Sequence, residues 1–369
     1  MAEEQVFSCS AYPVNNSYRE QTVYFAYPEE INRETGMMLL VSGFGGNPEA
    51  NVYKKMRKLF AEEYNLVVVQ STYLGMEFMG DSNEAYLDNS QVAELKRVLP
   101  DYIRDKVFQE KGKIDFAPLM DPSLPFTLNI TTHVKLNETE NNFVELGPVQ
   151  AIDCVRALQL VYEIILDNGY EINLDKVIAY GHSHGAYLAH LCNRFFPDLF
   201  SFILDNSAWL FPAYLQSPRV LVQKINNLVW QKIFNYRIAA QKYDPQLYDL
   251  SFLYNGFDNK ANIVIYQGVT DNLIKHEVKQ RIFKPVRHVI FNMITPDKVD
   301  GIAIKSTNHG DADFVELFHK EVRENGDLLS IKGRKNPFDS VEYIKTKQNT
   351  YMFDFFNGSP RIEVVTNLN

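Results

Sequence analysis

The pentapeptide GHSHG at positions 181–185 constrains the fold of this chain more than any other segment. It follows KVIAY (176–180), an apolar run typical of a buried strand, and precedes AYLAHLCNRF (186–195), a run with helical pattern. Glycines on both sides of a serine leave room where the backbones of a strand and a helix crowd together. The segment therefore predicts a strand–turn–helix unit that lifts the Ser183 hydroxyl above the edge of a sheet.

Short β-branched runs alternate with longer helical runs along most of the chain. This alternation favours an α/β fold with a mostly parallel central sheet and helices on both faces. We expect parallel strands at 37–42, 66–70, 176–180, 202–205, 263–267 and 301–306, and an early, antiparallel edge strand at 18–28. We expect helices at 50–62, 148–168, 186–195, 272–283 and 312–324. The last 45 residues contain short runs that fit no element of this scheme.

Two stretches interrupt the alternation. Residues 76–147 are largely polar, with one expected helix near 90–109 that Pro100 would kink or split. Residues 208–258 are rich in aromatic side chains and have a mostly helical pattern. We expect a single domain over 1–369 in which both insertions form a cap on the sheet. Long insertions in a compact domain are usually functional, so the cap is expected to have a role at the site.

The amino-acid composition limits the kinds of partner that this chain can bind. The 369 residues are 46% hydrophobic, enough for a large core, and the formal net charge of −9 argues against nucleic acid and anionic membrane surfaces as partners. Three widely spaced cysteines form no zinc or disulfide pattern and favour reduced thiols. The N-terminal residues resemble no signal peptide, and no apolar run could span a membrane, so we expect a cytoplasmic protein.

A serine needs a base to become nucleophilic at neutral pH, and the base needs an orienting carboxylate. Two expected strands after Ser183 end in suitable residues: 263–267 is followed by Asp271, and 301–306 by His309. Because parallel strands place their sites at their carboxyl ends, we predict that His309 is the base and Asp271 the acid. The alternative acid is Asp205, at the end of the expected strand 202–205.

Other histidines and acids fit these roles less well. Among the histidines after Asp271, His276 and His319 fall in expected helices and His288 precedes a run that suits a strand. Asp311 and Asp313 flank the base too closely in sequence to orient it.

The oxyanion formed during acyl transfer needs hydrogen-bond donors. We expect the backbone N–H of His184 to supply one, and the glycine-rich loop at Phe44 or Gly45 to supply the other. His182, Trp209 and Tyr73 are the predicted pocket residues. His182 and His184 could form a His-x-His metal pair, but a tight turn makes their side chains diverge and no third ligand is evident, so we predict no metal site.

These motifs resemble the α/β-hydrolase superfamily in element order over roughly residues 37–325. The resemblance implies a Ser-His-acid triad, a covalent acyl-enzyme and no cofactor. One departure is Ser42-Gly43, where many relatives have His-Gly in the oxyanion loop. The whole chain also resembles an uncharacterised family encoded beside flagellin-glycosylation genes in some motile bacteria. That second resemblance implies an acylated sugar, such as an O-acetylated nonulosonic acid, as the substrate.

The sequence therefore predicts a serine hydrolase that cleaves a carboxylic ester of a small molecule or glycan. Three alternatives remain open. The same triad would serve an acyltransferase in which a sugar hydroxyl replaces water. A peptidase is disfavoured because the chain has no propeller-like repeat. A non-catalytic protein of the same fold, binding a glycan or a partner protein, would have a broken or occluded triad.

Overall fold

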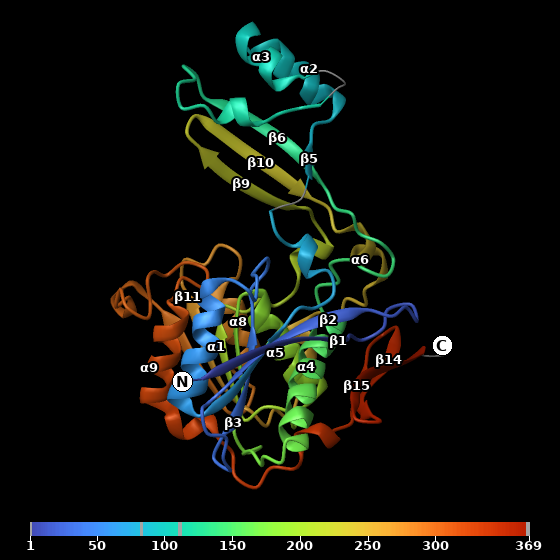
Figure 1. Ribbon diagram of the computed structural model, residues 1–369, viewed down its shortest axis with the longest axis vertical. Coiled ribbons are helices and arrows are strands. Elements are labelled where there is room, and N and C mark those ends of the chain that lie inside the picture. The colour runs from blue at the N-terminus through green and yellow to red at the C-terminus, as the bar shows by residue number, and fades with distance from the viewer. Residues whose placement is uncertain (1, 82–83, 110–112, 367–369) are drawn as a thin grey trace.

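The computed structural model of the chain describes residues 2–81, 84–109 and 113–366. At its centre lies an eight-stranded sheet in the order β1-β2-β4-β3-β7-β8-β11-β12 (Figure 1). Its strands are β1 (Glu3–Ser10), β2 (Glu20–Tyr27), β3 (Gly36–Val41), β4 (Leu66–Ser71), β7 (Val177–His182), β8 (Phe202–Asn206), β11 (Asn262–Gly268) and β12 (Val289–Ile294). β2 pairs antiparallel with both β1 and β4, and the strands from β4 to β12 are parallel.

Helices cover both faces of this sheet, and side chains of alternate strand residues divide between two cores. On one face, Met38 and Leu40 of β3 contribute to the core formed with α1 and α9. On the other, Met37 and Leu39 contribute to the core formed with α4, α5 and α8. The helices are α1 (Asn51–Tyr64), α4 (Pro148–Asp167), α5 (His184–Phe195), α8 (His276–Phe283) and α9 (Phe314–Asn325). This strand order and layering are those of an α/β-hydrolase, which confirms the predicted fold class.

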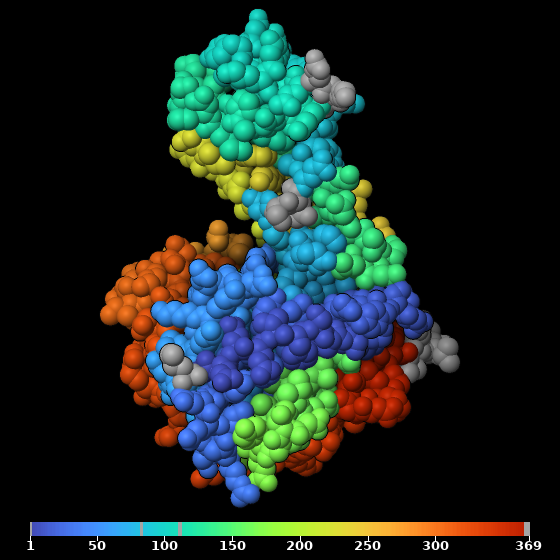
Figure 2. Space-filling view, viewed as in Figure 1, coloured from blue at the N-terminus to red at the C-terminus, as the bar shows by residue number. Residues whose placement is uncertain are grey.

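A second, smaller sheet stands beyond the main one. It has the order β5-β6-β10-β9 and carries two helices. Its elements are β5 (Glu84–Tyr86), α2 (Asn89–Val98), α3 (Asp101–Val107), β6 (Leu128–Lys135), β9 (Arg219–Ile225) and β10 (Leu228–Phe234). We call residues 84–109, 113–135 and 219–234 the cap, and the rest of the described chain the body. The cap has its own cluster of buried apolar residues and projects from the body through a narrow waist, with an open notch on one side (Figure 2).

The helical interpretation of 208–258 is wrong for its centre, where β9 and β10 form a hairpin. The hairpin turns at Asn226, whose φ of 52° is a conformation that asparagine tolerates well. Exposure alternates along β9, as expected for a strand with one covered face. The helices α6 (Arg237–Lys242) and α7 (Leu250–Leu253) are short.

The predicted strand at 301–306 is also wrong, and β12 is the last strand of the main sheet. The Asp300 side chain accepts hydrogen bonds from the backbone N–H groups of Ile302 and Ile304, which curls the segment into a turn. Only Ile304 forms a bridge, with Ala312.

The remaining predicted strands and helices of the body are confirmed within a few residues, as is the break at Pro100 between α2 and α3. Strand β1 was not predicted. The unassigned C-terminal residues include a three-stranded sheet, β13 (Glu342–Lys345), β14 (Asn349–Phe356) and β15 (Ser359–Thr366). Phe353 of this sheet stacks on Phe195 of α5, with ring centroids 4.1 Å apart. Short 3-10 helices lie at Met76–Phe78, Ala117–Met120, Ala213–Leu215, Pro296–Lys298, Gly326–Leu329 and Pro337–Asp339.

Candidate active site

Ser183 lies on a strained turn between β7 and α5. Its φ of 55° and ψ of −118° are rare for a residue with a side chain, and such a conformation costs about 1–3 kcal/mol. The residues on either side must be glycines, because the surrounding backbone leaves no room for a side chain. A Cβ on Gly181 would lie 2.4 Å from the nitrogen of Ala186, and one on Gly185 would lie 2.3 Å from the carbonyl oxygen of Val41. The turn therefore holds Ser183 at the start of α5, where the helix favours negative charge.

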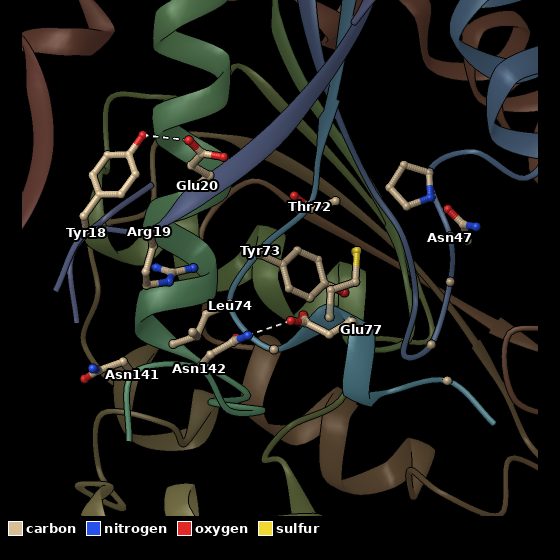
Figure 3. A pocket seen from close by; sticks show the side chains of 16 residues that line it. Tyr18, Arg19, Glu20, Asn47, Thr72, Tyr73, Leu74, Glu77, Asn141 and Asn142 are labelled. Carbon is tan, nitrogen blue, oxygen red and sulfur yellow. Dashed lines mark hydrogen bonds between the residues drawn. The ribbon is translucent and has the colours of Figure 1, made fainter. Parts of the chain in front are cut away.

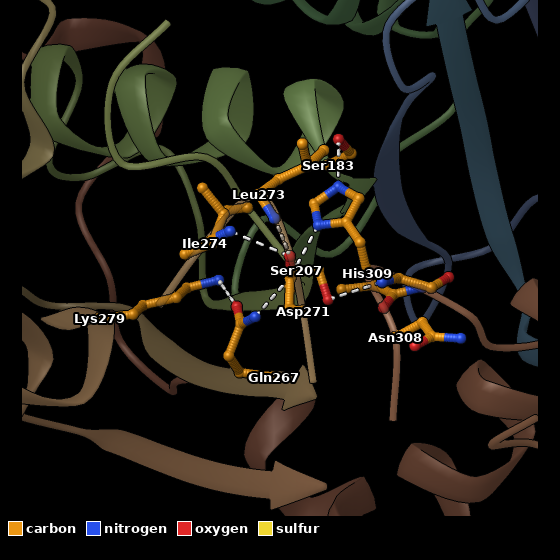
Figure 4. A network of polar contacts seen from close by, with 12 residues as sticks. Ser183, Ser207, Gln267, Asp271, Leu273, Ile274, Lys279, Asn308 and His309 are labelled. Carbon is orange, nitrogen blue, oxygen red and sulfur yellow. Dashed lines mark hydrogen bonds and ion pairs between the residues drawn. The ribbon is translucent and has the colours of Figure 1, made fainter. Parts of the chain in front are cut away.

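The three residues predicted to form a triad lie side by side. His309 Nε2 is 2.7 Å from Ser183 Oγ, and His309 Nδ1 is 2.7 Å from Asp271 Oδ2 (Figure 4). The other oxygen of Asp271 accepts hydrogen bonds from the backbone N–H groups of Leu273 and Ile274. The site thus contains a hydroxyl, an imidazole and a carboxylate, connected in the order that general-base catalysis needs.

The carboxylate of Asp271 is suited to stay charged. Burial raises its pKa, but the hydrogen bond and charge of His309 and the two backbone donors outweigh burial and lower it from the ordinary value. The Asp271 side chain is fully buried, whereas that of His309 is 14% exposed. A partly open base beside a buried acid allows a reactant to reach the imidazole without exposing the acid.

Asp205, the alternative acid, has other partners. It accepts hydrogen bonds from His190 Nε2 at 2.9 Å and from the backbone N–H of Ala208 at 2.6 Å. It also forms an ion pair with Lys279 Nζ at 2.8 Å. Within the described part of the chain, no hydrogen bond joins Asp205 to His309. The geometry therefore favours Asp271 in the role of the acid.

The backbone N–H groups expected to stabilise an oxyanion have no hydrogen-bond partner in the described part of the chain. They are the N–H groups of Phe44, Gly45 and His184. The loop can lie this close to the turn because Gly185 has no side chain: a Cβ there would lie 2.6 Å from the carbonyl oxygen of Ser42. The Phe44 ring lies 5.8 Å from that of His184. These N–H groups are the candidates for binding negative charge on a carbonyl oxygen attacked by Ser183.

The predicted pocket residues fall into two groups. Tyr73 and Trp209 belong to a buried aromatic cluster around His184, whose ring centroid is 5.9 Å from that of Tyr73 and 5.0 Å from that of Trp209. Burial lowers the pKa of His184 to about 3, so its ring is neutral. His182 instead lies beside the base, 5.9 Å from His309 between ring centroids, and burial together with the nearby His309 lowers its pKa to about 4.

A cavity of about 670 Å³ lies away from the triad, none of whose residues lines it. Gly45 of the oxyanion loop and Tyr73 are among its lining residues, and Figure 3 shows Tyr73 with its neighbours in the lining. Two pairs of its polar lining groups bind one another, Tyr18 with Glu20 and Asn142 with Glu77. We give more weight to the triad than to this cavity, because chemistry needs the reacting groups and volume alone does not provide them.

The sequence did not single out two polar residues next to the triad, Gln267 and Lys279. Gln267 donates a hydrogen bond from Nε2 to Asp271 Oδ2 at 2.6 Å, and Lys279 Nζ donates to Gln267 Oε1 at 3.2 Å. A signal was available for Gln267, since a buried glutamine at the end of the apolar run IVIYQ needs a polar partner.

Metal-binding clusters and membrane-spanning helices are both absent from the described residues. No group of three or more His, Cys, Asp or Glu side chains in these residues could hold a metal ion. None of the helices described here has the length and apolar character to cross a membrane.

Several solved structures are similar to this chain at low identity. Est1E from Butyrivibrio proteoclasticus is 11% identical over 83% of this chain and 93% of that one, with a TM-score of 0.42. An S-formylglutathione hydrolase from Agrobacterium tumefaciens is 16% identical over 79% and 86%, with a TM-score of 0.42. Esterase B from Lactobacillus rhamnosis is 13% identical over 88% and 86%, with a TM-score of 0.45.

In sequence, no curated protein matches the chain. One protein family does, over residues 7–238. That range contains the oxyanion loop, Ser183 and the described cap, whereas Asp271 and His309 lie beyond it. The match covers more than half of the sequence, so the chain belongs to the family described as "Protein of unknown function (DUF2920)".

Proposed function

We propose that this protein is a serine hydrolase that cleaves carboxylic esters. One observation carries the proposal: Ser183, His309 and Asp271 are connected by two hydrogen bonds of 2.7 Å at a strained turn that begins a helix. An ordinary turn serine has no need of a strained backbone, a histidine on its hydroxyl and a buried carboxylate behind that histidine.

The arrangement supports a two-step reaction. His309 Nε2 takes the proton of Ser183 while Oγ attacks the ester carbonyl, and the N–H groups of His184 and of Phe44 or Gly45 stabilise the oxyanion. His309 then gives the proton to the leaving alcohol, which leaves an acyl group on Ser183. In the second step His309 takes a proton from water, the hydroxide attacks the acyl carbonyl, and the acid departs as Ser183 regains its proton.

The substrate is proposed to be an O-acyl ester of a small molecule or sugar. The support for a sugar is the resemblance to the family encoded beside flagellin-glycosylation genes, together with the open notch beneath the cap (Figure 2). An ester panel that contains both aryl acetates and O-acetylated sugars tests this choice. Faster turnover of the sugars, measured as kcat/KM, would support it.

Hydrolysis of 4-nitrophenyl acetate tests the proposed activity itself. The wild-type protein should release 4-nitrophenol, and Ser183→Ala should lower kcat by at least about 10⁴-fold. Ser217→Ala, which changes an exposed serine of the same body, is the matched control and should leave the rate unchanged. Full activity in Ser183→Ala would contradict the proposal.

Acyl transfer uses the same triad and is separated from hydrolysis by products. If an added sugar acceptor captures most of the acyl group while little acid forms, the protein is an acyltransferase. If neither product forms and a fluorophosphonate does not label Ser183, the fold serves binding rather than catalysis.

A further inference from the structure

A buried polar chain lies directly behind the triad acid. From Asp271 it runs to Gln267 at the end of β11, then to Lys279 of α8 and to Asp205 at the end of β8 (Figure 4 shows the first three). Gln267, Lys279 and Asp205 are each 0% exposed. Fully buried polar groups are costly unless each is paired, so a chain of them next to a reactive site calls for a reason.

The hydrogen bonds to Asp271 fill its carboxylate. Oδ1 accepts from the N–H groups of Leu273 and Ile274, and Oδ2 accepts from His309 and from Gln267. A carboxylate offers about four lone-pair sites, so this one is saturated. Rotation about its terminal bond would break all four hydrogen bonds, which fixes the direction from Oδ2 toward the imidazole.

The amide of Gln267 can face Asp271 in two ways, and only one of them helps. If its NH₂ points to Asp271 it donates; if its oxygen points there, two acceptors meet. Lys279 decides between them because an ammonium group has three donors and no acceptor. Its Nζ donates to Gln267 Oε1, which turns the NH₂ of the same amide toward Asp271.

Lys279 is itself held in place by Asp205. Its Nζ lies 3.0 Å from Oδ1 and 2.8 Å from Oδ2. Burial acts to raise the pKa of Asp205, but the Lys279 charge and the His190 hydrogen bond outweigh burial and lower it to about 2. Asp205 also accepts hydrogen bonds from the backbone N–H of Ala208 and from His190, whose other ring nitrogen is bound to the Tyr254 hydroxyl.

We propose that Gln267 and Lys279 are positioning residues for the triad: Lys279, anchored on Asp205, orients the Gln267 amide, and Gln267 holds the Asp271 carboxylate toward His309. This inference rests on the proposed function for its role in catalysis. It also gives Asp205, the acid that the sequence offered as an alternative, a supporting place in the site.

Gln267→Met tests the proposal, since methionine fills similar space without a donor. We expect the rate of fluorophosphonate labelling at Ser183 to fall by about 10- to 100-fold, the range that a small misplacement of a catalytic group produces. The pH midpoint of labelling should also rise by about half a unit. A carboxylate with one donor fewer attracts the protonated imidazole more strongly, so a higher pH is needed to free the base.

Gln70→Met is the matched control. Gln70 is a buried glutamine at the end of β4, and its Oε1 accepts a hydrogen bond from the buried cation Arg57 at 2.5 Å, but it does not contact the triad. Both variants remove a buried strand glutamine bonded to a cation. A purely structural role for Gln267 would give the two variants the same labelling rate and pH midpoint.

A second variant addresses Lys279 and covers the case in which Gln267→Met does not fold. Changing Asp205→Leu and Lys279→Met together removes the ion pair without leaving either charge buried alone. The Gln267 amide is then free to turn, so we expect a smaller loss of labelling rate than in Gln267→Met, with the same upward direction of the pH midpoint.

The outcomes separate this inference from the proposed function. Folded Gln267→Met or the double variant with wild-type labelling rate and midpoint would overturn the positioning role. If the wild-type protein itself is not labelled, the proposed function fails, and NMR titration of the His309 ring decides the positioning role without any reaction. A higher pH midpoint for the His309 ring in Gln267→Met than in Gln70→Met would support the positioning role. Equal midpoints in the two variants would overturn that role.

Discussion

The body and the cap of this molecule differ in how their sheets are covered and assembled. In the body, helices cover both faces of a mostly parallel sheet, and Ser183 and Asp271 lie just beyond the ends of β7 and β11. In the cap, the central pair joins segments a hundred residues apart, since β10 pairs with β6 in a register that sets Leu228 beside Leu128. The candidate catalytic residues thus belong to one layered unit, whereas the cap is assembled from two segments distant in the sequence.

The two regions also have separate cores. The cap cluster includes Leu95, Ile130 and Trp230, and none of these residues belongs to either core of the body. Contacts between the regions include Arg219 of β9, which lies over the Phe44 ring of the oxyanion loop at 4.8 Å. We therefore expect chemistry to depend on the body, while stability of the cap and access to the site depend on the cap and its junction.

The largest effect is expected within the body. Asp271→Asn should lower kcat by about 10⁴-fold, because the neutral amide stabilises the wrong histidine tautomer. Asp205→Asn should instead destabilise the fold by about 3–5 kcal/mol, because it leaves Lys279 buried without its counter-charge. Steady-state kinetics and chemical denaturation of both variants distinguish the two acids, and a 10⁴-fold rate loss in folded Asp205→Asn alone would reverse the assignment.

The next effect should be confined to the cap. Trp230 is 6% exposed in the cap core and donates a hydrogen bond to Thr132 at 2.8 Å. Trp230→Ala should lower the free energy of unfolding of the cap by about 3–5 kcal/mol. Hydrogen exchange should rise in β6 and β10 while labelling of Ser183 stays within about twofold of wild type. A parallel loss of labelling would show that the cap is part of the catalytic unit.

Stability should depend on pH through Glu145, which lies between β6 of the cap and α4 of the body. Glu145 accepts hydrogen bonds at the start of α4 from Gly147 and Val149, and also from the Tyr248 hydroxyl. Burial raises its pKa from the ordinary 4.5 to about 7, against these hydrogen bonds. The folded protein therefore binds the proton more tightly than the unfolded chain.

The direction in which pH changes the stability of the fold follows from that difference. This carboxyl group favours folding fully below pH 4.5, and the contribution is lost as pH rises to about 7. Between pH 5 and pH 8, wild type should lose up to about 3 kcal/mol of stability relative to Glu145→Gln. Denaturant unfolding at the two pH values measures this, and identical pH dependence in both proteins would contradict it.

The smallest effect is expected at the contact between cap and oxyanion loop. Arg219 also lies over Phe234 at 4.7 Å and donates to the carbonyl of Met79 at 3.0 Å. Arg219→Met should cost about 1 kcal/mol, seen as a higher KM with kcat little changed. Lys224→Met, an exposed cation on the same strand, is the control. Equal KM values in both variants would show that Arg219 does not contribute to substrate binding.

The sequence was most informative where local chemistry alone decides the structure. Ser183 needs glycines on both sides, and a continuous apolar run can only be a buried strand or helix, so the turn and most body elements could be predicted. The strands of the cap hairpin and of the C-terminal sheet pair with their neighbours in the chain. Their signals are turn residues such as Asn357-Gly358 rather than apolar periodicity, which is why periodicity did not predict them. The segment before His309 has strand-like residues, but Asp300 binds its backbone and makes it a turn. The apolar run before Gln267 marks it as a buried glutamine, but its pairing with Lys279 and Asp271 could be recognised only once folding brings β8, β11 and α8 together.

The central claim is that the body holds an activated serine at position 183. Fluorophosphonate labelling followed by peptide mapping tests it most directly, with Ser183→Ala and Ser217→Ala in parallel. We expect one adduct per chain in the wild-type protein, on the peptide that contains Ser183. The adduct should be unchanged in Ser217→Ala and absent in Ser183→Ala. An adduct on another residue, or a well-folded wild-type protein that takes up no label, would contradict it.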